Sequence, residues 1–153
     1  MVGLDPSYLD KNPQTLSNGE KRKVALASIL VLNPSILVLD EPTIGLDSES
    51  ASNFIKLLRL LKRRYNKTII IASHNTELLH KIVDYLYVIN DGKVVLEGNK
   101  YDVFKQEKIL KKYGIKVPKI MEFSNTVLEK KNKKIGYRDE INDLIKDIYR
   151  YVK

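Results

Sequence analysis

The stretch 16–47 reads LSNGEKRKVALASILVLNPSILVLDEPTIGLD, and it decides the fold prediction. Small and apolar side chains recur at helical spacing and predict a helix at about 20–32. The apolar run 36–39 then lacks polar alternation, which predicts a strand covered on both faces. This strand ends on Asp40 and Glu41, and open α/β sheets place their ligands at the carboxyl ends of such strands. The stretch therefore predicts an α/β protein with a ligand site at these two carboxylates.

Polar side chains at the ends of these elements suit a bound phosphate and a metal ion. Ser17 and Gly19 lie where the helix begins, and the free N–H groups of a helix N-terminus can bind an anion. Asp40 suits coordination of Mg²⁺, and Glu41 suits orienting or deprotonating an attacking water. Each signal alone also fits an ordinary helix cap or a solvated turn. Their combination in this order is far more specific than any one of them.

A strand–helix–strand unit is predicted around the two carboxylates. Asp47 or Ser48 can cap a helix that runs to about residue 64, and the apolar run 68–72 predicts a second strand. Strands joined in this way are parallel and have a right-handed crossover. His74 follows the second strand, so it is expected at the same edge of the sheet as the two carboxylates.

A β-hairpin is predicted further along the chain. Asp91-Gly92 separates the runs 85–90 and 93–97, and this dipeptide is a strong signal for a two-residue hairpin turn. Asn99 can cap the helix that follows the hairpin. His80 has no motif around it, and it is expected on the surface of a short helix before the hairpin.

The last forty residues are predicted to form a small helical extension. We therefore divide the chain into a domain at 1–113 and an extension at 114–153. Residues 119–130 have helical spacing, and 138–152 predict an amphipathic helix. Its apolar stripe is too large for two short helices to cover, so a partner surface is expected there. The stripe consists of Ile141, Leu144, Ile145, Ile148 and Val152.

Composition restricts the classes of protein that the chain can belong to. Its 153 residues are 43% hydrophobic and 30% charged, as in soluble globular proteins. The absence of cysteine excludes disulfides and thiolate metal sites, and agrees with a cytosolic setting. The net charge of +8 is concentrated after residue 99. This basic region fits a solvated lysine-rich tail, or contact with an anionic membrane surface or nucleic acid.

The order of these motifs resembles that of the ATP-binding-cassette (ABC) ATPases. Residues 16–20 (LSNGE) resemble the signature motif, and 36–41 (ILVLDE) resemble the Walker B strand with its catalytic glutamate. Residues 45–47 (GLD) resemble the D-loop, and 73–75 (SHN) match the motif of the switch histidine. The resemblance implies a partial P-loop NTPase sheet with parallel strands, a C-terminal hairpin and a helical extension.

Two further segments, 2–10 and 113–123 (YGIKVPKIMEF), are similar to the ATPases of energy-coupling factor (ECF) transporters, which import vitamins or transition-metal ions. The resemblance implies an ATP-binding and ATP-hydrolysing subunit on the cytoplasmic face of the cell membrane. Its implied partners are a second ABC ATPase, in a homo- or heterodimer, and a transmembrane coupling subunit; no nucleic acid is expected. Asp40 would hold Mg²⁺, while Glu41 and His74 would be catalytic. ATP bound to the opposite subunit would contact Ser17, Asn18, Gly19, Glu20 and Asp47.

The sequence departs from the family pattern in three respects. It contains no Gly-x-x-x-x-Gly-Lys-[Ser/Thr], the loop that cradles nucleotide phosphates. We therefore expect a C-terminal half that needs an N-terminal half and is inactive alone. Asn18 stands where the family has Gly, and Asn tolerates a positive φ. Glu20 stands where Gln is usual, and its charge is expected to weaken binding of the opposite nucleotide.

Three other functions remain compatible with the sequence. The chain also fits an ATPase of another ABC importer subfamily, or a non-catalytic remnant that acts only in dimerisation. A third alternative is a soluble ABC protein that acts on ribosomes or nucleic acid, for which the basic tail is the only support. Salt-sensitive RNA binding would distinguish this last alternative from the transporter ATPases.

Overall fold

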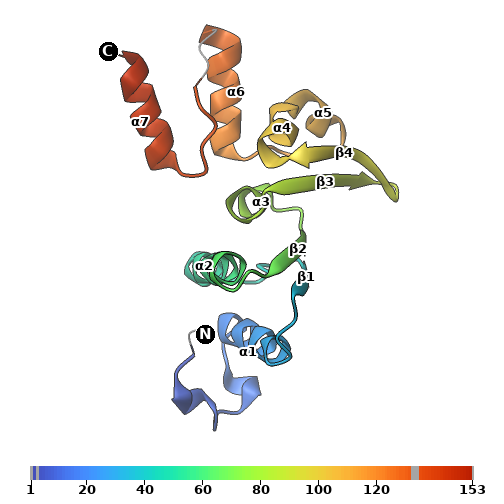
Figure 1. The fold of residues 1–153 in the computed structure, drawn as a ribbon, viewed down its shortest axis with the longest axis vertical. Coiled ribbons are helices and arrows are strands. Elements are labelled where there is room, and N and C mark those ends of the chain that lie inside the picture. The colour runs from blue at the N-terminus through green and yellow to red at the C-terminus, as the bar shows by residue number, and fades with distance from the viewer. Residues whose placement is uncertain (1, 3, 132–134, 153) are drawn as a thin grey trace. The chain divides into compact units, whose positions relative to one another are not determined.

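The computed structural model describes residues 2, 4–131 and 135–152 (Figure 1). The chain divides into two compact units, Met1–Ser73 and His74–Lys153. In the first unit, two short turns precede alternating helices and strands: η1 (Pro6–Tyr8), η2 (Pro13–Thr15), α1 (Asn18–Leu30), β1 (Ile36–Asp40), α2 (Ser48–Arg64) and β2 (Thr68–Ala72).

The strands β1 and β2 form a parallel pair, as predicted. Val38 lies opposite Ile70, and Asp40 lies opposite Ala72 at the carboxyl end. Helix α2 joins the strands and contacts β2. Together with the second unit's hairpin, this arrangement confirms the predicted α/β fold class.

Helix α2 supplies most of the core of the first unit. Its side chains Leu58 and Leu61 are fully buried, and each such burial stabilises the fold by about 1.5–3 kcal/mol. Asp47 caps the helix at its N-terminus, where a carboxylate complements the helix dipole. The last turn carries three basic residues, which complement the opposite end. The charged residues at both ends of α2 therefore have the signs that stabilise the helix dipole.

Within the described part of the first unit, the parallel pair is covered on one face only, which corrects the prediction for 36–39. Leu37 is 2% exposed, whereas Ile36 and Val38 are 55% and 72% exposed. Ile70, opposite Val38, is 53% exposed on the neighbouring strand. A strand whose residues are all apolar is fully buried only when other elements pack on both faces of its sheet. The described part of the first unit provides only one.

The second unit is built on an antiparallel hairpin. Its strands are β3 (Tyr85–Asn90) and β4 (Lys93–Asn99), and helix α3 (Thr76–Ile82) precedes them. Asp91 and Gly92 have φ values of +48° and +71°, which are the left-handed conformations that a type I′ turn requires. The turn chemistry of the sequence thus predicted this hairpin correctly.

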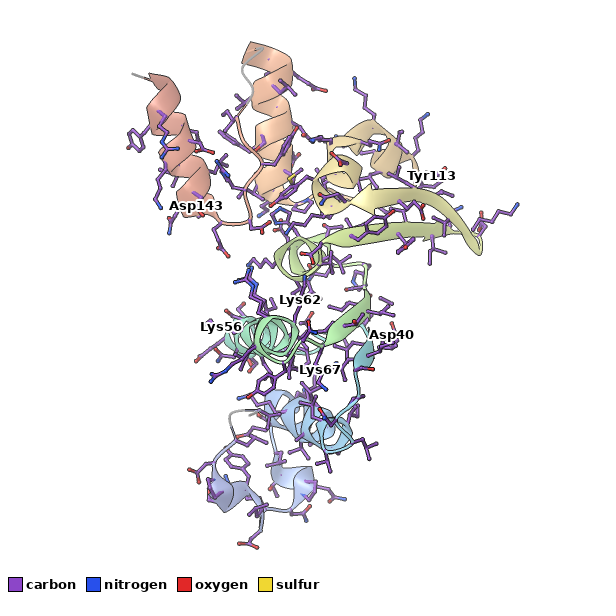
Figure 2. All side chains as sticks on the ribbon, viewed as in Figure 1. Asp40, Lys56, Lys62, Lys67, Tyr113 and Asp143 are labelled. Atoms are coloured by element: carbon purple, nitrogen blue, oxygen red, sulfur yellow. The ribbon has the colours of Figure 1, made fainter. Side chains whose placement is uncertain are left out.

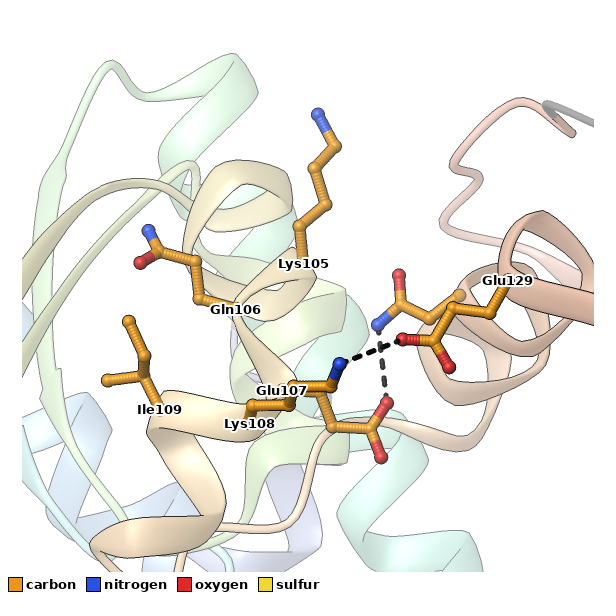
Figure 3. A pocket seen from close by; sticks show the side chains of 7 residues that line it. Lys105, Gln106, Glu107, Lys108, Ile109 and Glu129 are labelled. Carbon is orange, nitrogen blue, oxygen red and sulfur yellow. Dashed lines mark hydrogen bonds and ion pairs between the residues drawn. The ribbon is translucent and has the colours of Figure 1, made fainter. Parts of the chain in front are cut away.

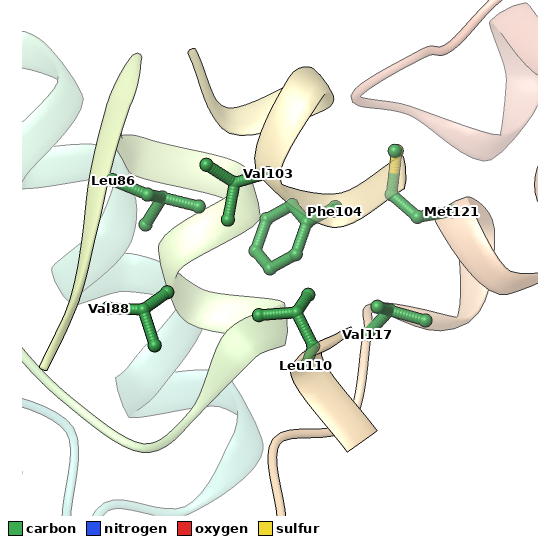
Figure 4. Packing of buried hydrophobic residues seen from close by; sticks show 7 residues of the cluster. All are labelled: Leu86, Val88, Val103, Phe104, Leu110, Val117 and Met121. Atoms are coloured by element: carbon green, nitrogen blue, oxygen red, sulfur yellow. The ribbon is translucent and has the colours of Figure 1, made fainter. Parts of the chain in front are cut away.

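Four helices follow the hairpin: α4 (Lys100–Lys105), α5 (Glu107–Lys112), α6 (Lys119–Lys131) and α7 (Ile141–Val152). Asn99 caps α4, as predicted, by accepting a hydrogen bond from the N–H of Tyr101. One apolar cluster joins the hairpin to α4, α5 and the start of the extension (Figure 4). It consists of Leu86, Val88, Val103, Phe104, Leu110, Val117 and Met121.

The apolar stripe of α7 is divided between core and surface. Leu144 is 4% exposed, whereas Ile141 and Ile145 are 65% and 42% exposed. The side chain of Val152 lies outside the described residues. No helix among residues 2, 4–131 and 135–152 combines the length and apolarity needed to cross a bilayer.

His80 is buried, so the prediction of a surface position is wrong. It is 1% exposed, and its ring packs against the rings of Tyr101 and Phe104. The ammonium group of Lys100 donates to the His80 carbonyl at 2.8 Å and lies 2.6 Å from the Asp139 carboxylate. The local sequence around His80 did not reveal its burial, because the residues that cover it follow His80 by twenty or more positions.

Candidate functional site

The predicted signature turn is a self-contained helix cap. The Ser17 hydroxyl accepts a hydrogen bond from the Glu20 N–H at 3.3 Å, and Glu20 Oε2 accepts one from the Ser17 N–H at 2.8 Å. These reciprocal bonds form a capping box, which satisfies two of the N–H groups left open at a helix start. The turn therefore has a fixed shape before any ligand binds.

A third residue holds the Glu20 carboxylate. The Tyr8 hydroxyl donates a hydrogen bond to Glu20 Oε1 at 2.5 Å. The hydrogen bonds from Tyr8 and Ser17 lower the pKa of Glu20 to about 2. Glu20 is therefore ionised at neutral pH, and both of its oxygens accept bonds from its own chain. Sequence reasoning assigned no role to Tyr8, which lies twelve residues away.

Asn18 and Gly19 open helix α1 in different ways. Asn18 has a negative φ as the first helical residue, so the anticipated left-handed conformation is not needed there. At Gly19, an added Cβ would lie 2.8 Å from Ser50 Oγ and 3.1 Å from Ser50 Cβ. A side chain at residue 19 would therefore crowd Ser50, because the first turns of α1 and α2 approach each other closely here.

The predicted D-loop lies at this same approach. Asp47 caps α2 by accepting a hydrogen bond from the Ser50 N–H at 2.8 Å, and the bonds from Ser50 lower the pKa of Asp47. Arg22 on α1 donates to the Ile44 carbonyl at 2.6 Å. The structure thus brings the signature turn and the D-loop turn together, although 22 residues separate the two ends of the Arg22 bond.

The two predicted carboxylates follow one another at the carboxyl end of β1. Asp40 is exposed there, and Figure 2 labels it on the strand. Glu41 has a φ of +41°, which is uncommon for a residue with a side chain and occurs often at functional sites. Its N–H donates to the Ala72 carbonyl at 2.9 Å, and the Ser73 hydroxyl donates to its Oε2 at 2.7 Å. The end of β2 therefore holds both the backbone and the side chain of Glu41.

His74 is the exposed first residue of the second unit and directly follows Ser73 in the chain. Asn75 next to it caps α3 by accepting a hydrogen bond from the Leu78 N–H at 3.1 Å. The predicted catalytic role of His74 stays a prediction.

The chain is similar to several known proteins. A family model described as "AAA domain, putative AbiEii toxin, Type IV TA system" matches residues 7–80. The energy-coupling factor transporter ATP-binding protein EcfA2 of Clostridium perfringens is 42% identical over 142 residues, which is 92% of this chain and 49% of that protein. EcfA of Methanocaldococcus jannaschii is 36% identical over 152 residues, 99% of this chain and 54% of that protein.

This chain is related to the ATPases of ABC transporters, and within them to the ECF group. It spans about half the length of the curated relatives that it matches. The structure of cbiO1 from Clostridium perfringens, part of the ABC transporter complex cbiONQ, matches it with a TM-score of 0.63 and 36% identity over 80% of this chain and 48% of that one. A dimeric ATP-binding cassette bound to ADP and Pi matches with a TM-score of 0.57 and 28% identity over 65% of this chain and 42% of that one.

The carboxylates of this chain fit a magnesium ion better than a metal held by protein ligands alone. Among the described residues, no three His, Cys, Asp or Glu side chains gather as a possible metal centre. Mg²⁺ is usually bound by one or two carboxylates, with phosphate oxygens and waters completing its octahedron. The exposed Asp40 can supply one such carboxylate.

A shallow groove of the second unit involves none of these residues (Figure 3). It has a volume of about 260 Å³ and lies between the α4–α5 turn and α6. Across it, Lys108 lies 3.9 Å from Glu129, and the Asn125 amide donates to Glu107 at 3.5 Å. The ion pair and the hydrogen bond therefore connect α5 to α6 across the groove, and the predicted site residues do not line it.

Proposed function

We propose that this chain is the C-terminal part of an ATP-binding and ATP-hydrolysing subunit that powers an ECF-type importer of vitamins or transition-metal ions. The identity to ECF ATPases over 92–99% of the chain supports this function. Its partners are the N-terminal half of the domain, a second ABC ATPase and a transmembrane coupling subunit. It acts on the cytoplasmic face of the membrane.

Each site residue has a distinct proposed role. Asp40 holds Mg²⁺, which neutralises charge on the phosphates when it is bound. Glu41 accepts a proton from the attacking water and orients it, and His74 contacts the γ-phosphate. The nucleotide of the opposite subunit contacts the joined turns of α1 and α2 through Ser17, Asn18, Gly19, Glu20 and Asp47.

The observation that best supports this proposal is the pair of hydrogen bonds that hold Glu41 at the end of β2. A general base must be held within hydrogen-bond reach of the proton that it removes. Two bonds from the end of β2 fix Glu41, and its strained backbone is retained beside an exposed Asp40. Asn, Asp and His adopt a positive φ more readily than Glu, so the conformation of Glu41 supports a functional position.

The experiment is ATP turnover by the complex assembled with the N-terminal half. Glu41→Gln is expected to retain ATP binding and to lose turnover by on the order of 10²-fold or more, because the amide cannot accept the proton. Glu97→Gln, at an exposed position on β4, is the matched control and should keep wild-type turnover. Equal turnover in the two variants would reject the role of Glu41.

We further propose that the extension 114–153 serves as a dimerisation module. The exposed Ile141, Ile145 and Tyr149 are four residues apart on α7, so they lie on one side of the helix. Apolar side chains gathered in this way favour association with a partner surface.

A further inference from the structure

Ser73 connects the two parallel strands at the point where the proposed chemistry takes place. Its hydroxyl lies 2.7 Å from Glu41 Oε2, across 32 residues of sequence. An ionised carboxylate can only accept hydrogen bonds, so the Ser73 hydroxyl is the donor. The contact is partly buried, and a bond to a charged group is about twice as strong as one between neutral groups.

We propose that Ser73 is a positioning residue for ATP hydrolysis, and that it acts by fixing the orientation of the Glu41 carboxylate. This inference rests on the proposed role of Glu41 as the base. The N–H of Glu41 is already bonded to Ala72, so its Cα is held by the strand pair. The long side chain still has rotatable bonds between its Cα and its carboxylate, and the Ser73 bond restrains them at their far end.

The strand register explains why residue 73 has this position. Asp40 pairs with Ala72, so the next residue on each strand, Glu41 and Ser73, emerges side by side at the edge of the sheet. Glu41 turns into the left-handed region there, at a φ of +41°. A hydroxyl on the neighbouring strand is therefore placed to hold a carboxylate that the backbone has turned out of the strand.

A positioning role and a structural role predict different kinetics. A residue that only stabilises the strand pair would lower the melting temperature and leave kcat unchanged in the folded fraction. A residue that orients the base lowers kcat and leaves the affinity for ATP unchanged, because misplacement of a catalytic group by about 1 Å costs up to about 10²-fold. Thr keeps the hydroxyl that Ala removes.

The test uses the complex assembled with the N-terminal half and the partner ATPase. Ser73→Ala is expected to lower kcat by about 10- to 100-fold, with an unchanged KM and unchanged affinity for a non-hydrolysable ATP analogue. Ser73→Thr is expected to recover most of the lost kcat. Ser52→Ala, at an exposed position on α2, is the matched control and should behave like the wild type.

A double variant separates this inference from the function on which it rests. If Ser73 acts only through Glu41, adding Ser73→Ala to Glu41→Gln leaves the residual rate unchanged. Two results would overturn the role of Ser73 even if Glu41→Gln loses turnover as expected. One is a double variant whose loss of rate is the product of the two single losses, and the other is an unchanged kcat in Ser73→Ala. Wild-type turnover in Glu41→Gln would instead overturn the proposed role of Glu41, and the inference with it.

Discussion

Asp139 holds a buried lysine of the second unit, and its replacement gives a measurable prediction. The Lys100 side chain is 7% exposed, and its ammonium group lies 2.6 Å from the Asp139 carboxylate. The Tyr101 hydroxyl donates to the same oxygen at 2.8 Å. Burial alone raises the pKa of Asp139, but the hydrogen bonds from Lys100 and Tyr101 outweigh it, so the pKa is lowered. The native fold therefore favours the ionised carboxylate, which Asp139→Asn removes.

The expected cost follows from the burial of the two partners. Removing one partner of a fully buried ion pair costs about 3–5 kcal/mol, because the other charge is left without compensation. Asp139 is 39% exposed, so water screens part of this loss, and an Asn amide oxygen still accepts a hydrogen bond. We therefore expect Asp139→Asn to destabilise the contact between α4 and the segment just before α7 by about 2 kcal/mol, or about 30-fold in its opening equilibrium.

Hydrogen exchange of the chain assembled with its proposed N-terminal half measures this local opening. The amides of α4 and of the segment that carries Asp139 should lose about 30-fold in protection, because protection reports the free energy of opening. The control is Glu129→Gln, which removes a charge 3.9 Å from Lys108, where both side chains are well exposed. Such pairs contribute about 0–1 kcal/mol, so little change is expected. Equal loss of protection in both variants, or none in Asp139→Asn, would refute the reasoning.

Three more predictions concern other parts of the chain. Burial lowers the pKa of His80 below its ordinary value of 6.5. As the pH falls, His80 therefore takes up its proton at a higher pH in the unfolded chain than in the folded chain. Resistance to urea should therefore fall as pH drops below 6.5, and His80→Gln should flatten this part of the profile. Gly19→Ala should destabilise the first unit by about 1–3 kcal/mol through overpacking against Ser50, and adding Ser50→Ala, which removes the hydroxyl at 2.8 Å, should recover part of the melting temperature; no recovery would contradict this. Changing Ile141 and Ile145 together to Asp should weaken association with the proposed partner ATPase in sedimentation, with an unchanged melting temperature. An unaltered sedimentation profile would show that α7 does not take part.

Much of the fold could be predicted because its signals are local. The left-handed turn at Asp91-Gly92 and the caps at Asp47 and Asn99 each depend on residues within a few positions. The strand ends at Asp40 and Ala72 follow from apolar runs of about five residues. Backbone conformation and helix capping depend on residues within a few positions of each other, so they can be predicted directly from the sequence.

Burial was predicted less well, because it depends on what packs against a residue. The composition of 36–39 indicated two covered faces, yet the described residues of the first unit cover one. His80 was expected at the surface, yet α4 and Asp139 enclose it. Leu144 and Ile145 are adjacent in one apolar stripe, and only the first is buried. Helical and strand periodicity give the direction of a side chain, but not the presence of a neighbour.

The sequence by itself determined the fold class and the residues proposed for the candidate site, because the order of its motifs carries that information along the chain. Only the tertiary structure decided how they are held. Ser73 reaches Glu41 across 32 residues, and Tyr8 reaches Glu20 across twelve. Gly19 meets Ser50 because two helix starts approach each other. Such contacts arise from strand pairing and helix packing, which bring distant positions within hydrogen-bond range, and no local pattern of residue types specifies which partners will meet.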